Sequence, residues 1–286
     1  MKLFAIDLDG TLLSSKVEVS SENNAAIREA QEAGHKIMIC SGRAPEDISN
    51  ILEQEKLDCP VAGSNGTVVW VDGKELSTIS LDKKDAADVS KQLDELSIPY
   101  RVYTNKGIYI PFSWMDRMTS AIDQNPIIKE TVSAEELKRM TEQPKETDTV
   151  KLFDSIEELL NDESLTIQKF FTLTINAEVK KQLAGKLQEI SGIAITSSGL
   201  FNIEVMDING HKGNGLKTVA SYFDIPLTDT LAIGDNFNDI PMLEQAAFSI
   251  AMGNADPKVK ELCDAVTLTN DENGVAHAIH KYLLEK

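Results

Sequence analysis

The chain has 286 residues, and its 46 acidic side chains outnumber the 28 basic ones, which gives a formal net charge of −18. Hydrophobic residues make up 42% of the sequence and charged residues 26%, a globular composition at a length that suits one large domain or two of ordinary size. The negative charge argues against a general nucleic-acid binder, which needs a basic face, and against docking on anionic membrane surfaces.

Strand and helix patterns alternate along the first 80 residues. The apolar runs that predict strands are residues 3–6, 37–40, 61–62, 67–71 and 75–79. A helical spacing over residues 24–33 ends at Gly34, a common residue after a helix, and Pro45 suits the first turn of a second helix. Asp72 and Gly73 predict a hairpin turn. Strands separated by helices predict a parallel sheet with crossover connections.

From about residue 81 the pattern changes. A charged amphipathic helix is predicted over residues 83–96, and Ser133 and Glu136 have the spacing of a helix capping box. The other elements predicted here are strands at 100–103, 108–110 and 170–175 and a helix at 179–190. This segment is typical of an α+β insert rather than of a continued parallel sheet.

After about residue 205 the alternation of strands and helices resumes. Helices are predicted at residues 212–223, 239–246, 257–263 and 275–284, and strands at 230–233, 248–251 and 265–268. We therefore expect an α/β fold with a Rossmann-like parallel-sheet core. The core would comprise residues 1–82 and 205–286, with an inserted α+β domain at 83–204.

The cysteines and the start of the chain indicate a compartment. Cys40, Cys59 and Cys263 are an odd number at wide spacing, so neither a disulfide framework nor a structural zinc site is expected. The first apolar run is too short for a signal peptide, and no long uncharged apolar stretch follows. We expect a soluble, cytoplasmic protein that is a monomer or a weak homodimer.

The strongest chemical signal is Asp7-Leu8-Asp9-Gly10-Thr11, directly after the first predicted strand. Ligands of open α/β sheets bind at the carboxyl ends of the strands. Of two carboxylates placed there, one can act as a nucleophile while the other donates and removes protons. An acidic turn without a chemical role is the alternative interpretation.

Two further segments could bind phosphate. A serine hydroxyl and the following backbone N–H groups, as in Ser41-Gly42-Arg43, form a site for phosphate oxygens, although an ordinary capped loop would have the same sequence. Lys212 begins a predicted helix in a glycine-rich segment, where its charge could neutralise a phosphoryl group or simply be solvated. His211 is expected to be a polar residue of the helix start rather than a metal ligand.

The fourth segment follows the predicted strand at 230–233. It places Asp235, Asn236, Asn238 and Asp239 within five positions. Carboxylate and amide oxygens are the hard ligands that Mg²⁺ prefers. A polar loop with Asp239 as a helix N-cap is the alternative, but four such residues together favour a metal site.

In order and context, these four segments resemble the haloacid dehalogenase-like superfamily. The matches are Asp7-x-Asp9-Gly10-Thr11 to its first motif, Ser41 to the second, Lys212 to the third, and Gly234-Asp235-x-x-Asn238-Asp239 to the fourth. The insert lies between the second and third motifs. With Asn65-Gly66 and Ser41-Gly42-Arg43, this placement resembles the Cof-type subfamily of sugar-phosphate phosphatases. Only 33 positions separate Asp7 from Ser41, which argues against the subgroup that contains β-phosphoglucomutase.

The resemblance implies a mechanism with an aspartyl-phosphate. Asp7 would attack phosphorus, Asp9 would protonate the leaving oxygen and then activate water, and Lys212 would neutralise phosphoryl charge. The groups expected to hold Mg²⁺ are Asp7, the backbone carbonyl of Asp9, Asp235 and, as a ligand or a neighbour of one, Asn236. Those expected to hold phosphate oxygens are Ser41, Lys212, Asn238 and the N–H groups of Leu8 and Gly42, with Arg43 and Asn65 at the rim. Asp239 is expected to orient Lys212 or metal-bound waters.

Residues 83–204 would then be a cap that closes over the site and selects the substrate. Its aromatic residues Tyr100, Tyr103, Trp114 and Phe170 are more simply core residues than pocket residues. The expected function is Mg²⁺-dependent hydrolysis of small phosphate monoesters such as sugar phosphates. The expected partner is a small phosphorylated metabolite, with no nucleic acid and no membrane.

Two alternatives remain. A phosphomutase of the phosphomannomutase type has the same cap placement. A non-catalytic sensor of a phosphorylated ligand is the alternative outside enzymes. Such a sensor would be expected to lack one of the two early carboxylates, and both are present.

Overall fold

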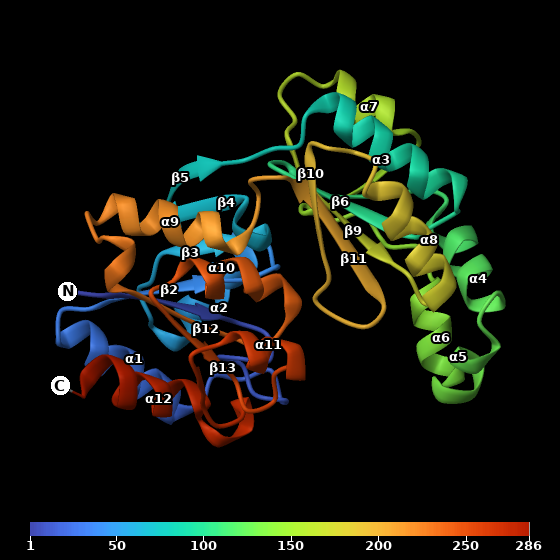
Figure 1. Ribbon diagram of the computed structural model, residues 1–286. Helices are drawn as coiled ribbons and strands as arrows, with labels where there is room; N and C mark the ends of the chain where they lie inside the picture. The colour runs from blue at the N-terminus through green and yellow to red at the C-terminus, as the bar shows by residue number, and fades with distance from the viewer. Residues whose placement is uncertain (286) are drawn as a thin grey trace. The chain divides into compact units, whose positions relative to one another are not determined.

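The computed structural model describes residues 1–285, without the side chains of residues 126, 127 and 131. The chain divides into two compact units (Figure 1). The first joins Met1–Ile79 to the segment from Gly210 to the C-terminus, and the second is Ser80–Asn209. The insert expected at residues 83–204 lies inside the second unit.

The first unit is built on an eight-stranded sheet with the order β14-β13-β12-β1-β2-β3-β4-β5. Its strands are β1 (Leu3–Asp7), β2 (Lys36–Cys40), β3 (Val61–Gly63), β4 (Val68–Val71), β5 (Lys74–Thr78), β12 (Thr230–Gly234), β13 (Phe248–Ala251) and β14 (Ala265–Val266). The strands from β14 to β3 pair in parallel, and β4 and β5 add an antiparallel hairpin at the edge. The α/β prediction with a Rossmann-like core is confirmed.

Helices cover both faces of this sheet. They are α1 (Ser21–Glu32), α2 (Pro45–Glu55), α9 (Lys212–Tyr222), α10 (Ile240–Gln245), α11 (Pro257–Leu262) and α12 (Gly274–Ala278). The pair α1 and α12 and the pair α9 and α10 each pack together, and Figure 1 shows the two pairs on opposite sides of the sheet. All five residues of β1 are buried, as expected for a parallel strand covered on both faces.

Two predicted helices differ from the observed ones. The helix expected at 239–246 is preceded by a 3₁₀ turn, Phe237–Asp239, so that Asp239 ends this turn and α10 begins at Ile240. The helix expected at 275–284 is α12 followed by a π-helical segment, Ile279–Leu284. Both differences lie at helix ends, where local hydrogen bonding rather than apolar spacing decides the geometry.

The second unit is an α+β domain on a six-stranded sheet with the order β10-β11-β9-β6-β7-β8. Its strands are β6 (Tyr100–Thr104), β7 (Gly107–Pro111), β8 (Val150–Phe153), β9 (Ile167–Leu173), β10 (Ile193–Thr196) and β11 (Asn202–Asp207). Its helices are α3 (Lys83–Glu95), α4 (Trp114–Asp123), α5 (Pro126–Thr131), α6 (Ala134–Thr141), α7 (Ile156–Asn161) and α8 (Ala177–Leu187). The expected strand at 170–175 thus begins and ends earlier, as β9.

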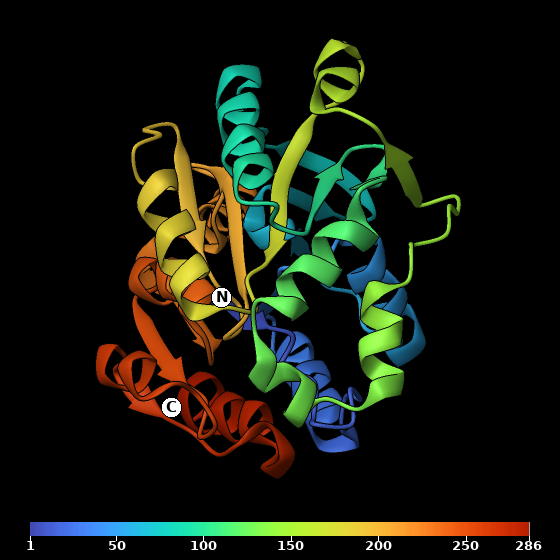
Figure 2. The same cartoon turned by 90° about the vertical axis from the view of Figure 1, so that its right-hand side faces the viewer.

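Two apolar clusters hold this unit together. The larger one joins the sheet to α3, α7 and α8 through side chains such as Val102, Phe170 and Leu183. The smaller one joins α4, through Trp114 and Met118, to side chains of α5, α6 and the sheet. Figure 2 shows α4 and α6 in green, and α4 packs against both α5 and α6. Ser133 caps α6 by accepting the Glu136 backbone N–H at 3.2 Å, the first half of the predicted capping box.

Across residues 1–285, no helix is both long and apolar enough to cross a membrane.

Candidate active site

The parallel sheet of the first unit brings the chemical motifs to one edge. Asp7 ends β1 and Asp235 directly follows the neighbouring β12, whose Ile233 is in register with Ile6. Ser41 follows β2, and Asn65 lies in the turn after β3. Because these strands are parallel neighbours, their carboxyl ends and the polar residues that follow them lie side by side.

Lys212 is fully buried at the first position of α9. The His211 side chain caps this helix by accepting the Asn214 N–H, as predicted for a polar residue at the helix start. The Lys212 ammonium donates to Oδ1 of Asp7 and to Oδ1 of Asp239, both at 2.5 Å. Burial alone would lower the pKa of Lys212, but the charges of Asp239 and Asp7 outweigh burial and raise it. Lys212 therefore remains protonated.

Three carboxylates meet around this ammonium. Asp7, Asp235 and Asp239 each offer one oxygen, and these atoms lie within 4.8 Å of one another. The Thr11 hydroxyl donates to Asp235 at 3.0 Å. Oδ2 of Asp239 accepts the backbone N–H groups of residues 235 and 236, both at 2.9 Å. The hydrogen bonds fix the carboxylates of Asp235 and Asp239 before any ligand binds.

The cluster has too little positive charge. Burial, followed by the charge of Asp239, raises the pKa of Asp7 well above its ordinary value, although Lys212 acts in the opposite direction. The same two causes raise the pKa of Asp235 to about 6. One ammonium faces three carboxylates, so a cation is needed to keep all of them ionised. A compact set of carboxylate oxygens fits a hard divalent ion such as Mg²⁺.

The loop after β1 passes very close to Asp235. Gly10 has a φ of +80°, and a Cβ atom there would lie 2.6 Å from Oδ2 of Asp235. Both observations require glycine at this position. The Asn254 side chain donates to the Gly10 carbonyl at 2.8 Å and so holds the loop from the other side. Sequence reasoning missed Asn254, although it follows the predicted strand at 248–251 and the strand-end rule would have found it.

The residues expected to bind phosphate form a connected group. The Ser41 hydroxyl accepts the Arg43 backbone N–H at 3.2 Å, with Gly42 between them, and the Ser41 carbonyl accepts the Asn65 N–H at 2.8 Å. The Asn238 side chain donates to Oδ1 of Asn65 at 3.2 Å. The turn after β3 thus joins the second motif to the fourth.

Backbone geometry near these residues is also constrained. Ser64, Asn65 and Gly66 all have positive φ angles, of 49°, 62° and 86°. Conformations of this kind cost energy in residues other than glycine and concentrate at functional sites. Leu8 has a fully buried side chain and its carbonyl accepts the Leu13 N–H at 2.9 Å, which anchors the loop that carries Asp9.

Asp9 lies apart from the three buried carboxylates. Its side chain is 52% exposed and receives two hydrogen bonds from Arg43, from Nε at 2.9 Å and from Nη2 at 2.5 Å. The guanidinium of Arg43, which is expected at the rim of a phosphate site, binds the Asp9 carboxylate in this structure. The Asn236 side-chain oxygen accepts the Phe237 N–H at 2.8 Å and caps the following turn. Asp239 completes the cluster of carboxylate oxygens formed with Asp7 and Asp235.

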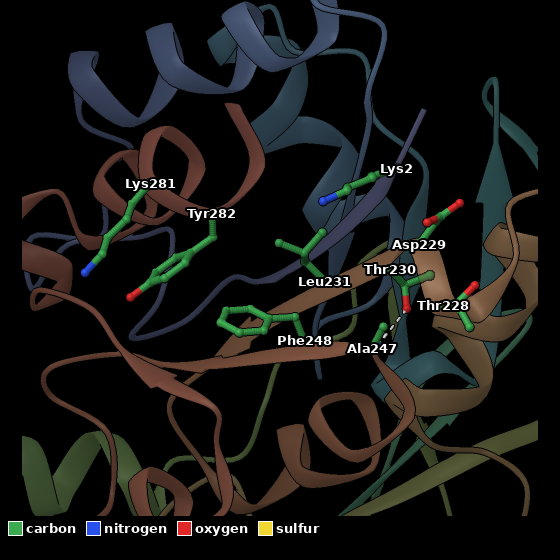
Figure 3. Close-up of a pocket in the computed structure, with 9 residues that line it drawn as sticks. All are labelled: Lys2, Thr228, Asp229, Thr230, Leu231, Ala247, Phe248, Lys281 and Tyr282. Carbon is green, nitrogen blue, oxygen red and sulfur yellow. Dashed lines mark hydrogen bonds between the residues drawn. The ribbon is translucent and has the colours of Figure 1, made fainter. Parts of the chain in front are cut away.

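A pocket of about 320 Å³ lies at the opposite end of the strands, where β1 and β12 begin (Figure 3). Its lining includes Lys2, which precedes β1, and Thr230, which begins β12. The rings of Phe248 and Tyr282 lie beside each other there, with centroids 5.2 Å apart. The length of the strands separates this pocket from the acidic cluster, so the pocket is not the reaction site.

Known proteins resemble this chain in sequence and in fold. The family model of haloacid dehalogenase-like hydrolases matches residues 4–279. Phosphatase YwpJ of Bacillus subtilis (strain 168) is 35% identical over 286 residues, which cover 99% of this chain and 100% of that protein. The 5-amino-6-(5-phospho-D-ribitylamino)uracil phosphatase YwtE of the same organism is 33% identical, with coverages of 99% and 98%.

A solved structure agrees with these relatives. A haloacid dehalogenase-like hydrolase from B. subtilis superposes with a TM-score of 0.83 at 34% identity, over 99% of this chain and 100% of that one. The match extends over both units of the chain rather than over the motifs alone. The chain therefore belongs to the haloacid dehalogenase-like hydrolase family, as its four motifs predicted, and it is an enzyme of the phosphatase class.

Proposed function

We propose that the chain is a Mg²⁺-dependent phosphatase that hydrolyses small phosphate monoesters through an aspartyl-phosphate on Asp7. The observation that carries this proposal is the buried contact of Asp7 with Lys212 beside Asp235 and Asp239. A carboxylate that is to attack a phosphate must be ionised, close to positive charge and protected from bulk water. This arrangement meets the last two conditions and needs a metal ion for the first.

Asp7, Asp235 and the backbone carbonyl of Asp9 are the groups that would hold Mg²⁺, with Asn236 and Asp239 beside them. The ion supplies the positive charge that lets an anionic carboxylate approach an anionic phosphate. The chain's own residues do the rest. Lys212, Ser41, Asn238 and the N–H groups of Leu8 and Gly42 hold phosphate oxygens, and Arg43 and Asn65 lie at the rim.

The reaction has two balanced steps. In the first, an oxygen of Asp7 bonds to phosphorus while the bond to the alcohol oxygen breaks, and Asp9 gives a proton to that oxygen. In the second, Asp9 takes a proton from water as the water oxygen bonds to phosphorus, and the Asp7–phosphorus bond breaks to release phosphate. Asp9 is half exposed, so its side chain can turn from Arg43 toward the substrate.

The substrate is proposed to be a small phosphorylated metabolite. The name of one relative describes a phosphatase of a phosphoribityl compound, which is a monoester on a sugar-alcohol chain. The second unit, Ser80–Asn209, is proposed to be the cap that selects among such monoesters. Its fold is independent of the catalytic unit and has its own apolar clusters, so it can vary without disturbing the chemistry.

The test is phosphate release from a panel of sugar phosphates and p-nitrophenyl phosphate, with and without Mg²⁺. Asp7→Asn should abolish turnover, and Asp9→Asn should lower kcat by about 10²–10⁴-fold, as expected for loss of a general acid–base group. Glu29→Gln, an exposed acid of the same unit that pairs with His280, is the matched control and should leave kcat unchanged.

Acid-quenched reactions with a ³²P-labelled substrate should show label on the wild-type protein and none on Asp7→Asn. Full activity of Asp7→Asn would refute the nucleophile assignment. Transfer of label to a second sugar faster than its release as phosphate would instead identify a phosphomutase.

A further inference from the structure

A second cavity lies within the Ser80–Asn209 unit, and none of the residues assigned to the reaction above lines it. Its volume is about 360 Å³, within the range of small-molecule sites. Its walls come from β6, α4, the end of α6 with the segment that follows it, and the end of β9. Three features of these walls bear on what the cavity could hold: an unpaired arginine, an excess of positive charge, and an apolar floor.

The arginine is Arg101, in the middle of β6. Its neighbours Tyr100 and Val102 are buried in the larger apolar cluster, so Arg101 points to the opposite face of the sheet. Its guanidinium carbon lies 5.2 Å from the centroid of the Trp114 ring. Nε of Arg101 is buried without a hydrogen-bond partner, and within residues 1–285 no carboxylate pairs with this side chain.

Arg117 provides an internal comparison. It also lies over an aromatic ring, 5.1 Å from the centroid of Tyr100. Its guanidinium, however, donates to the Asp94 carboxylate at 2.6 Å and to the carbonyl of Ile98 at 3.1 Å. Arg117 is thus fully satisfied by the fold, whereas Arg101 is not. A buried guanidinium N–H group without an acceptor is costly, and a bound anion could remove that cost for Nε of Arg101.

The other polar side chains of the lining also include an unpaired donor and positive charges outside ion pairs. Nε2 of Gln143 is buried and also has no partner. Arg139 and Lys145 line the cavity, and neither belongs to an ion pair in the described part of the chain. The cavity lining contains one acidic side chain, Glu142. This positive lining is found in a unit whose acidic side chains outnumber its basic ones.

The apolar part of the lining comes from Met118, Met140 and Leu173, next to Trp114. Methionine side chains adapt to the shape of different ligands. We propose that this cavity binds a small organic anion, with its carboxylate or phosphate group on Arg101 and Gln143 and its apolar body against Met118, Met140 and Leu173. Such an anion is either a second charged group of the substrate or a separate effector.

The chain offers a direct reporter of binding. It contains two tryptophans, and Trp70→Phe leaves Trp114 at the cavity as the single one. Nε1 of Trp70 has no hydrogen-bond partner, so phenylalanine loses no such bond there. The probe is cyclohexanecarboxylate, which does not absorb near tryptophan, and the neutral control is cyclohexanecarboxamide. We expect a saturable change of Trp114 fluorescence with the carboxylate and at least tenfold weaker binding of the amide.

Arg101→Met keeps the stem of the side chain and removes its charge, and should weaken carboxylate binding by about tenfold or more. Lys138→Met, an exposed charge of α6 outside the cavity, is the matched control and should bind like the parent. Lys145→Met is a second variant at the exposed rim, should Arg101→Met fail to fold. Equal responses to carboxylate and amide, or unchanged binding by folded Arg101→Met and Lys145→Met, would overturn the proposal.

Kinetics then distinguish the two sources of the anion. If it belongs to the substrate, Arg101→Met should raise KM for sugar bisphosphates and leave KM for p-nitrophenyl phosphate unchanged. If it is an effector, cyclohexanecarboxylate should change kcat or KM for p-nitrophenyl phosphate in the wild type and not in Arg101→Met. Because binding is read from fluorescence, this proposal can fail while the phosphatase assignment stands, and the reverse also holds.

Discussion

Lys212→Met removes the ammonium shared by two buried carboxylates. The side chain of Lys212 is 0% exposed, and those of Asp7 and Asp239 are 6% and 1% exposed. Removing one partner of a buried ion pair costs about 3–5 kcal/mol, because the remaining charge stays buried without compensation. We therefore expect the free energy of unfolding of the metal-free protein to fall by about that amount at pH 7.

A buried carboxylate can become neutral by taking up a proton. The free energy of protonation therefore limits how far the free energy of unfolding can fall. Protonating an aspartate with an ordinary pKa at pH 7 costs about 4 kcal/mol, and at pH 5 about 1.5 kcal/mol. Asp7 is the group expected to take up the proton, because burial and then the charge of Asp239 already raise its pKa. The loss in Lys212→Met should therefore shrink on acidification, by at most about 1.4 kcal/mol for each pH unit.

The assay is urea unfolding in EDTA at pH 7 and pH 5, followed by the fluorescence of Trp70 in a Trp114→Phe background. Trp70 lies in β4, so it reports on the first unit alone, which avoids mixing the transitions of two units. Lys217→Met is the control, because Lys217 is an exposed lysine of the same helix as Lys212 and its loss should leave the free energy of unfolding nearly unchanged. A loss below 1 kcal/mol for Lys212→Met at pH 7, or an equal loss at both pH values, would refute the reasoning.

Three further predictions concern the same edge of the sheet. Burial and a neighbouring carboxylate raise the pKa of Asp235 from 3.8 to about 6, so the metal-free folded state binds this proton more tightly than the unfolded state. Stability in EDTA should then fall as pH rises from about 4 to 6, and urea unfolding of Asp235→Asn should show a flatter pH dependence. Gly10→Ala should lower the free energy of unfolding by about 1–3 kcal/mol more than Gly34→Ala, as measured by thermal unfolding. Both glycines have a positive φ, of +80° and +86°, but only at Gly10 would the new Cβ atom meet a nearby side chain. Arg43→Met should change the free energy of unfolding by less than about 1 kcal/mol, because its pair with Asp9 is half exposed, yet it should raise KM for phosphate monoesters; a larger stability loss with unchanged KM would contradict its place at the rim.

The core unit could be predicted from the sequence because its signals are local. Residues 3–6 and 230–233 are short, mainly apolar runs, as expected of strands buried on both faces, and each is followed within two positions by an aspartate. Parallel strands place such residues at one edge, so the strand ends alone indicate that Asp7 and Asp235 meet. No knowledge of packing between distant helices is needed for this step.

Much of the second unit could not be predicted, because its strands are stabilised by partners far away in the sequence. The strand β11 contains Asn202, Glu204 and Asp207, which indicate an exposed segment. In the structure Glu204 is 2% exposed and forms an ion pair with Lys169 of β9 at 2.5 Å. From the sequence, a buried acid is taken for a surface residue until its lysine partner on the neighbouring strand is known, so hydrophobic periodicity fails for this strand.

The site itself shows where motif spacing stops being informative. Spacing identifies Asp7 and Asp9 as two carboxylates of one loop, but it does not determine which one is buried, because the choice depends on partners outside the loop. Lys212 lies 205 positions from Asp7 and draws it into the interior, whereas Arg43 lies 34 positions from Asp9 and binds it at the surface. The two carboxylates are thereby given different surroundings: Asp7 a buried ammonium and two further acids, Asp9 solvent and a guanidinium. The roles proposed for them require these two surroundings, because a nucleophile must be kept from water and an acid–base group must exchange protons with it.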